Sequence, residues 1–410
     1  MIIDMSFKNK RILVIHLDYC FENANTLIVE RILHQLKQDY DVDIATYDVK
    51  GANHQYGSDL ERIKTVKYYS LNRAMNTANL EISDVLRICF CNIKEKITKS
   101  KFDEKNVYYF KKQLCKKIRI SDYNLILSFS NPFSSHYAAS LISKEYDIPW
   151  IAYYLDPFFT NATFDKNGLK MRKHLEERIT GHAKTLYLTY PINEDYIENE
   201  FENRDLIRRI EMPGIRNEIH VSDTNQCGEI AQCYFVGNLY SDIRNPDSVI
   251  SLFGKMGNVA ELFFVGGFFG DIPMLTENNY ANIHYLGKKS QGEIKEIYKM
   301  TDVLVNIGNL IINQIPSKIF EYISTGKPII NIYKTLKCPT LKYTKKYPLC
   351  LNIYEEDMKS CPEKAVKIID DFIRKTRGRY LSSQEINEMF WGNLDASVTK
   401  DLKSKIEEEI

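Results

Sequence analysis

The stretch from residue 303 to residue 332 constrains the fold more than any other part of the chain. The apolar run 303–307 predicts a buried strand, and a short helix is expected to begin at Pro316 and to end at Gly326. Proline suits the first turn of a helix, and glycine takes the left-handed conformation that often ends one. A second apolar run follows at 328–332. A strand, a helix and a strand in this order are typical of a crossover in a parallel sheet.

The start of this helix is a candidate site for phosphate. Backbone amides without helical partners and the positive end of the helix dipole attract anions there. Ser317 can cap these amides, and Lys318 adds a cation. Glu321 projects from the same end of the helix one turn further on, where a carboxylate repels phosphate but suits the hydroxyls of a ribose. These residues predict a pocket for a nucleotide diphosphate, and an ordinary crossover without a ligand is the alternative.

Short apolar runs alternate with helical stretches in two separate series along the chain. The first series predicts strands at 10–16, 42–47, 123–130, 148–155 and 186–190, and helices at 23–38 and 134–146. The second predicts strands at 233–237, 260–267, 283–287, 303–307 and 328–332, and helices at 247–256, 291–300 and 316–326. This alternation predicts an α/β fold class with two doubly wound parallel sheets.

The chain is too long for one compact core, since its 410 residues fit two domains of ordinary size. Residues 216–230 are polar and have little apolar periodicity, as expected of a connection between domains. The sequence therefore predicts a first domain over 1–215 and a second over 216–384. The remaining tail, 385–410, is expected to be helical.

Composition excludes several classes of protein. A net charge of +1 gives no overall attraction to nucleic acid, so we expect no nucleic-acid partner. Nine cysteines without a CxxC pair indicate a reducing compartment. The first residues lack the apolar core of a signal peptide, and no run approaches the ~20 apolar residues of a membrane-spanning helix. We therefore expect a cytoplasmic protein.

Two well-separated segments resemble the family-4 glycosyltransferases, which have the GT-B fold. The first shares with that family the groups Pro316-Ser317-Lys318, Glu321-Tyr322 and Gly326-Lys327-Pro328. The family typically has a second glutamate eight positions before Glu321, where this chain has Asn313. The second segment, 123–157, has a serine-rich strand end, a proline-containing loop, a helix, and then Pro-Trp and Asp-Pro.

This resemblance implies two Rossmann-like domains that face each other across a cleft, with 385–410 crossing back to the first domain. It implies transfer of a sugar from a nucleotide diphosphate sugar to a hydroxyl of a polysaccharide or lipid-linked glycan. Family members retain the anomeric configuration. That outcome suggests attack on the same face of the sugar, with the departing phosphate helping to take the acceptor proton.

The resemblance places the donor in the second domain. Arg244 and Lys318 are expected to stabilise the departing diphosphate, and Glu321 to bind the ribose. The family often has a second cation on the loop of Arg244, where this chain has Asn238. Further donor-binding candidates lie after predicted strands or at the helix start: Gly237, Gly266, Gly287, Asn313 and Ser317.

Acceptor-side candidates lie at strand ends of the first domain or shortly after them. Asp156 follows a predicted strand and is expected to bind or polarise the acceptor hydroxyl, with a turn-forming role as the alternative. His16 and His136 are two further candidates. Asn23 and Asn25 lie in the loop where many relatives have a glycine-rich segment.

A metal is not expected. An Asp-x-Asp group, Asp41-Val42-Asp43, lies at the start of a predicted strand. Ligands of open α/β sheets bind at the opposite, carboxyl ends of the strands. We therefore expect a metal-independent reaction without a cofactor, in which the nucleotide sugar is a substrate.

Residues 94–119 are rich in lysine, with aromatic residues between the lysines. A solvated helix face explains most such runs. The sharper hypothesis is a peripheral contact with anionic lipid headgroups on the inner face of a membrane.

Two other functions remain open at the level of sequence. A nucleotide-sugar epimerase would use the same scaffold, but it needs acid and base groups around the sugar. A non-catalytic partner that binds a sugar nucleotide or an active homologue would explain Asn238 and Asn313, which replace residues that active family members usually have.

Overall fold

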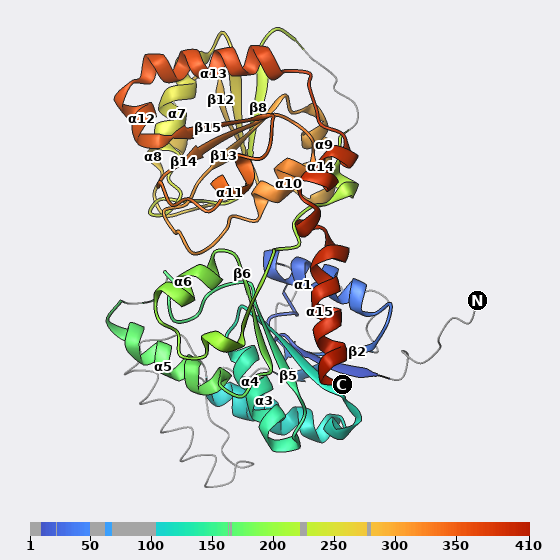
Figure 1. The fold of residues 1–410 in the computed structure, drawn as a ribbon. Helices are drawn as coiled ribbons and strands as arrows, with labels where there is room; N and C mark the ends of the chain where they lie inside the picture. Colours follow the sequence, from blue (N-terminus) through green and yellow to red (C-terminus); the bar gives the residue numbers. More distant parts are fainter. Residues whose placement is uncertain are drawn as a thin grey trace, which may run out of the picture. The chain divides into compact units, whose positions relative to one another are not determined.

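The computed structural model describes residues 10–21, 23–49, 62–67, 104–162, 164, 166–221, 228–276 and 280–410. The chain forms two compact units (Figure 1). The first contains Met1–Pro213 and Asp395–Ile410, and the second contains Gly214–Leu394.

The first unit is built on a parallel sheet with the strand order β3-β2-β1-β4-β5-β6-β7. Its strands are β1 (Arg11–Ile15), β2 (Asp41–Asp48), β3 (Ile63–Lys67), β4 (Leu125–Ser130), β5 (Trp150–Tyr154), β6 (Thr185–Thr189) and β7 (Ile207–Ile210). The order reverses between β1 and β4, as in a doubly wound fold. Strands β4, β5 and β6 are buried along their whole length, which explains why they are nearly continuous apolar runs.

Helices pack around this sheet through their apolar faces. They are α1 (Ala24–Leu36), α3 (Glu104–Lys117), α4 (Ser134–Tyr146), α5 (Leu169–Thr180), α6 (Ile192–Glu198) and α15 (Asp395–Glu409). The Asn23 side chain caps α1 by accepting hydrogen bonds from the amides of Asn25 and Thr26, both at 3.0 Å. An asparagine cap therefore occupies the loop where the sequence lacks a glycine-rich segment.

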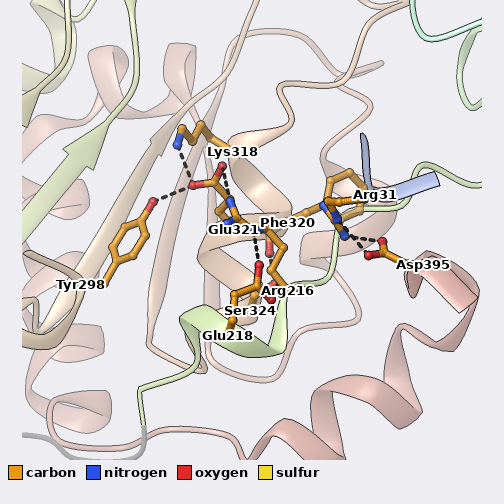
Figure 2. Close-up of polar contacts among 9 residues, drawn as sticks. All are labelled: Arg31, Arg216, Glu218, Tyr298, Lys318, Phe320, Glu321, Ser324 and Asp395. Carbon is orange, nitrogen blue, oxygen red and sulfur yellow. Dashed lines mark hydrogen bonds and ion pairs between the residues drawn. The ribbon is translucent and has the colours of Figure 1, made fainter. Parts of the chain in front are cut away.

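The last helix, α15, belongs to the first unit and packs against α1 (Figure 1, red and blue). Arg31 forms an ion pair with Asp395 (Figure 2), and Lys10 forms another with Glu407 at 2.6 Å. The returning segment begins at Asp395 and not at residue 385, because α14 (Ser383–Met389) forms part of the second unit.

The second unit repeats the topology of the first. Its parallel sheet has the order β12-β10-β8-β13-β14-β15. The strands are β8 (Ala231–Val236), β10 (Ala260–Val265), β12 (Ile283–Gly287), β13 (Val303–Ile307), β14 (Ile329–Tyr333) and β15 (Cys350–Tyr354), and a small separate sheet pairs β9 (Leu239–Tyr240) with β11 (Phe268–Phe269). The prediction of two doubly wound Rossmann-like sheets is therefore confirmed.

Helices also flank the second sheet. They are α7 (Asp247–Phe253), α8 (Pro273–Thr276), α9 (Gln291–Met300), α10 (Lys318–Ser324), α11 (Leu341–Thr344), α12 (Glu355–Ser360) and α13 (Pro362–Thr376). Helix α13 and the edge strands β7 and β15 were not expected from the sequence. Both edge strands are only partly buried; β7 contains two arginines, whereas β15 is mostly apolar and was overlooked.

A row of asparagines crosses three neighbouring strands of the second sheet. Asn306 donates to Asn331, and Asn331 donates to Asn352, each at 2.7 Å. The strand register places Asn306 opposite Asn331 and Asn331 opposite Asn352. Because Asn306 and Asn331 are buried, these bonds offset the cost of burying their amides and favour one register.

The stretch after Pro213 is packed, although the sequence predicted a polar connection over 216–230. The Arg216 amide donates to the Ser324 hydroxyl at 2.9 Å. A Cβ atom at Gly214 would lie 2.3 Å from the ring of Phe320, so only glycine fits under that ring. Residues 214–221 therefore belong to the second unit, while 222–227 lie outside the described residues.

A buried carboxyl group organises one loop of the first unit. Glu176 of α5 accepts a hydrogen bond from the Tyr196 hydroxyl at 2.8 Å and another from the Phe159 amide at 3.0 Å. Burial raises the pKa of Glu176 to about 8, so the native state keeps this group protonated near neutral pH.

We predict that the first unit loses stability as the pH rises from 6.5 to 8, and that Glu176→Gln reduces this loss. The unfolded chain releases the Glu176 proton near its ordinary pKa of 4.5. Unfolding therefore releases a proton below pH 8, and each pH unit costs about 1.4 kcal/mol. Buried His136 and His182 act in the opposite direction near pH 6.5, because burial lowers their native pKa values to about 3 and about 4 while the unfolded chain binds protons at them up to their ordinary pKa of 6.5. This contribution is the same in the parent protein and in Glu176→Gln, so it cancels when the two pH dependences are compared.

Urea denaturation followed by Trp150 fluorescence measures this effect in a Trp391→Phe background, since these are the two tryptophans of the chain. Glu198→Gln, an exposed change on α6, is the control and should leave the pH dependence as it is in the parent protein. An unchanged slope in Glu176→Gln would contradict the prediction.

Candidate functional site

Three glycine-containing loops meet at the carboxyl ends of β8, β10 and β12. The Gly237 amide donates to Val265 at 2.8 Å, and the Gly266 amide donates to Gly287 at 2.9 Å. Gly266 has φ +138°, and a Cβ atom there would lie 2.0 Å from the Gly237 carbonyl oxygen. Gly287 has φ +69° with open space around it. Close backbone packing thus explains Gly266, and a left-handed turn explains Gly287.

Arg244 joins the two strands between which the order of the second sheet reverses. Its Nε donates to Asn309, just after β13, at 2.6 Å, and its Nη1 donates to the Asn238 carbonyl, just after β8, at 3.1 Å. Burial lowers the pKa of Arg244, but a guanidinium stays charged in proteins. In open α/β sheets this reversal point is the usual ligand site.

Asn238 has a structural role in this loop. Its side-chain oxygen accepts a hydrogen bond from the Gly267 amide at 3.1 Å and so ties the β8 loop to the β10 loop. The residue at the position of the expected second cation therefore holds backbone together, a function that lysine cannot perform because it has no acceptor.

The expected cap of α10 is absent. Ser317 has helical backbone angles, φ −57° and ψ −24°, and its side chain makes no capping hydrogen bond. A capping side chain reaches the amides of the first turn from an extended backbone, and Ser317 lacks that conformation. The prediction that Ser317 caps these amides is therefore wrong.

Glu321 is the centre of a polar cluster at the start of α10 (Figure 2). Its Oε2 atom accepts from Lys318 Nζ at 2.6 Å and from the Tyr298 hydroxyl at 3.1 Å. Its Oε1 atom lies 3.6 Å from Nη1 of Arg216, whose Nε donates to Glu218 at 2.8 Å. The Glu321 side chain is 17% exposed, so a ligand can still reach it.

These contacts differ from the electrostatic roles that were expected from the sequence. Lys318 and Glu321 form one ion pair, whereas the sequence assigned one to phosphate and the other to ribose. Although burial works in the opposite direction, the hydrogen bond to Glu218 and the charge of Glu321 raise the pKa of Arg216. Arg216 therefore adds a stable positive charge next to the Glu321 carboxylate.

Two other residues of the 316–330 segment are structural. The Tyr322 hydroxyl accepts from the Val236 amide at 2.7 Å and donates to the Val236 carbonyl at 3.0 Å, which fixes α10 to the end of β8. Lys327 is buried and donates to the carbonyls of Lys299 and Thr301. Burial lowers the pKa of Lys327, and this lysine lies away from solvent.

Asn313 lies in the loop between β13 and α10 and is 8% exposed. Its contact with a donor sugar stays a prediction.

The first unit contains a pocket of about 260 Å³ at the carboxyl ends of β4 and β5. Asp156 contributes to this pocket and is 7% exposed. Asn25 Nδ2 donates to Asp156 Oδ2 at 2.7 Å. The lining residues are Ser130, Asn131, Pro132, Phe133, Ser134, Asp156, Pro157, Phe158, Asn161 and Phe164.

Both candidate histidines are buried in the first unit. His16 and His136 have 0% exposure. Ser128 Oγ accepts a hydrogen bond from Trp150 Nε1 and shares another with His136 Nδ1, each at 2.7 Å. Burial, and then the neighbouring His16, lower the pKa of His136 to about 3. These positions do not suit contact with an acceptor, and we leave both histidines out of the proposed site.

The described residues contain no group of three or more His, Cys, Asp or Glu side chains with the arrangement of a metal site. Within the Asp-x-Asp group, Asp43 is buried and accepts from the Tyr123 hydroxyl at 2.6 Å and from Arg11 at 2.9 Å. Asp41 forms an ion pair with Arg62. Both carboxylates at the start of β2 thus have partners within the first unit.

The lysine-rich stretch is described only from residue 104, because 94–103 lie outside the described residues. Within α3, Lys111 forms an ion pair with Glu145, and Lys117 donates to the Thr65 carbonyl at 2.6 Å. In the part of the chain that the structure describes, no helix is both long and apolar enough to cross a membrane.

Three residues that contact Glu321 or Arg244 were not predicted from the sequence. Arg216, in the stretch after Pro213, and Tyr298, in α9, both contact Glu321. Asn309, in the loop after β13, accepts a hydrogen bond from Arg244. Arg216 is separated from Glu321 by more than a hundred positions in sequence. Of these three residues, only Asn309 could have been found from the sequence, because it follows a predicted strand at the edge of the sheet where ligands bind.

Comparisons with known proteins define the fold. No family model matches the chain, and no curated protein matches it in sequence. Solved structures with similar folds include sucrose-phosphate synthase from Thermosynechococcus elongatus (13% identity, 97% of this chain and 98% of that chain, TM-score 0.67). HepE from Anabaena in complex with UDP-glucose is also similar (10% identity, 97% and 99% of the chains, TM-score 0.64).

A third similar structure is the lipopolysaccharide outer core galactosyltransferase WaaB in its apo form (13% identity, 98% and 100% of the chains, TM-score 0.61). Each similarity extends over nearly the whole of both chains. The chain therefore has the GT-B fold, and the fold-class prediction is confirmed.

We predict that Tyr322→Phe lowers the free energy of unfolding of the second unit by about 1–3 kcal/mol, because it leaves the buried amide and carbonyl of Val236 without partners. Hydrogen exchange of the peptide 231–240 should also become faster. Tyr380→Phe is the control, since Tyr380 is 43% exposed. Unchanged exchange in Tyr322→Phe would show that the hydroxyl does not hold α10 to β8.

Proposed function

We propose that this chain is a glycosyltransferase that moves a sugar from a nucleotide diphosphate sugar to a hydroxyl of a glycan or lipid-linked glycan. The Glu321 cluster is the single observation that carries this proposal. It presents a partly exposed carboxylate, oriented by Tyr298 and Lys318, next to the strand ends where a doubly wound sheet binds its ligand. A carboxylate in that position suits the two hydroxyls of a ribose.

The phosphate side of the proposal rests on Arg244 and Lys318. The Nε and Nη1 groups of Arg244 have protein acceptors, and among the described residues no protein atom accepts from Nη2. Charge builds on the diphosphate as the anomeric bond breaks, and fixed cations at that point lower the barrier. When ribose hydroxyls donate hydrogen bonds to the Glu321 carboxylate, the ammonium group of Lys318 can interact with a phosphate as well as with Glu321.

The chemistry proposed is a retaining transfer without a metal. The acceptor hydroxyl attacks on the face from which the diphosphate leaves, and the leaving phosphate oxygen takes the acceptor proton. No enzyme nucleophile is then needed. Asn313 is proposed to bind hydroxyls of the donor sugar, and the backbones at Gly237, Gly266 and Gly287 to lie beside the nucleotide.

The acceptor is proposed to bind the first unit near Asp156. The lysine-rich stretch 94–119 is proposed to contact anionic lipid headgroups on the inner face of a membrane, which would bring the enzyme to a lipid-linked acceptor. HepE, one of the structures with this fold, was solved with UDP-glucose. That complex supports a uridine diphosphate sugar as the first donor to test.

We predict that Glu321→Ala weakens UDP binding by about 10- to 100-fold, as expected for the loss of hydrogen bonds to a charged group. Arg244→Ala should mainly lower the rate of sugar release from UDP-glucose, because its charge acts on the departing diphosphate. Calorimetric titration with UDP and GDP and a donor-hydrolysis assay measure the two effects.

Glu296→Ala is the matched control, because Glu296 and Lys299 form an exposed ion pair three residues apart, as Lys318 and Glu321 do. Wild-type binding and turnover in Glu321→Ala would reject the ribose assignment. Tight UDP binding without any donor turnover in the parent protein would favour a non-catalytic sugar-nucleotide-binding protein.

A further inference from the structure

We propose that the pocket beside Asp156 binds one sugar ring of the acceptor. This inference rests on the proposed function and assigns a sugar unit of the acceptor, rather than its lipid chain or a phosphate group, to one pocket of the first unit. It adds Phe158, Phe164 and Asn161 to the acceptor site, none of which the sequence singled out.

Aromatic rings form one part of the pocket lining. Phe133 and Phe158 are stacked, with ring centroids 4.0 Å apart and planes 12° apart, and Phe164 meets Phe158 edge-on at 5.7 Å. The face of an aromatic ring is electron-rich, and the C–H groups on one side of a pyranose carry partial positive charge. An aromatic lining therefore favours a sugar ring laid against it.

Polar groups supply the remainder of the lining. Asp156 accepts hydrogen bonds, and Ser134 and Asn161 both donate and accept them, which matches the hydroxyls of a sugar. None of the ten lining residues is lysine or arginine, and Asp156 is acidic. The guanidinium of Arg172 lies over the Phe164 ring at 5.1 Å, but this side chain is buried and its Nε donates to the Phe159 carbonyl. Carboxylate repulsion therefore opposes a phosphate, while the polar groups and the small size of the pocket oppose an alkyl chain.

The volume also fits a single ring. The pocket holds about 260 Å³, which is below the ~300–1,000 Å³ typical of sites for drug-sized ligands. A longer glycan would place one residue in the pocket and extend beyond it.

The pocket is built on fixed backbone. Ser130 Oγ donates to the Asp156 carbonyl at 3.1 Å, and Asn25 holds the Asp156 carboxylate at 2.7 Å. The Phe158 amide donates to Tyr196 at 2.9 Å, and Tyr196 in turn donates to buried Glu176. Such a preformed site binds without first ordering its loop.

The test is saturation-transfer NMR on the full chain, in the presence and absence of UDP, with methyl glycosides of glucose, galactose, mannose and N-acetylglucosamine. We expect at least one glycoside to receive saturation, and Asp156→Asn and Phe164→Ala each to weaken its binding at least tenfold. Asp205→Asn and Ile197→Ala change exposed residues of the same unit and should bind as the parent protein does. Asp156→Asn preserves shape, so it keeps the test valid if Phe164→Ala fails to fold.

Three outcomes would overturn the inference: no glycoside binds, binding survives both pocket variants, or n-octanol or inorganic phosphate competes for the site. UDP titration of the same samples separates this result from the proposed function. UDP binding that depends on Glu321 without any glycoside binding rejects the pocket assignment alone. Glycoside binding that depends on Asp156 without any nucleotide binding rejects the donor site and keeps the pocket.

Discussion

The position of the candidate donor site depends on one pair of hydrogen bonds between Tyr322 and the backbone of Val236. Helix α10 is only seven residues long, which is too short to be stable alone. By fixing this helix to the end of β8, Tyr322 determines where Glu321 lies, one residue earlier and outside the core. Tyr322 thus anchors the helix, and its neighbour Glu321 presents a carboxylate.

The fold was largely predictable because most of its strands and helices follow from the pattern of apolar residues within each segment. Fully buried parallel strands such as β4 and β13 are continuous apolar runs, and helices α4 and α9 began and ended where their patterns did. Strand β7 contains two arginines among its four residues and was missed for that reason, whereas β15 is mostly apolar and was overlooked. The start of the returning segment was misplaced by ten residues, because α14 and α15 follow each other as one helical stretch in sequence.

The site was less predictable, since its geometry comes from contacts between distant positions. The place of Glu321 in the first turn of a short helix was predictable, but its partners Arg216 and Tyr298 were not. The two substituted asparagines illustrate the same limit. In the sequence, Asn238 indicated only the loss of a cation, whereas in the structure its side-chain oxygen accepts a hydrogen bond from the Gly267 amide. His136 looked like an acceptor residue because nothing in the sequence shows that α4 turns it into the interior.

The asparagine row across β13, β14 and β15 has an evolutionary consequence. Asn331 bonds both of the other asparagines and also donates to Thr344 at 3.3 Å, so replacing Asn331 by an aliphatic residue removes a partner from the Asn306 amide and from the Asn352 side-chain oxygen. Single changes at these positions are therefore penalised, while a joint replacement by aliphatic side chains would be tolerated. In diverged copies of this protein the three positions should be inherited as a block, either all polar or all aliphatic.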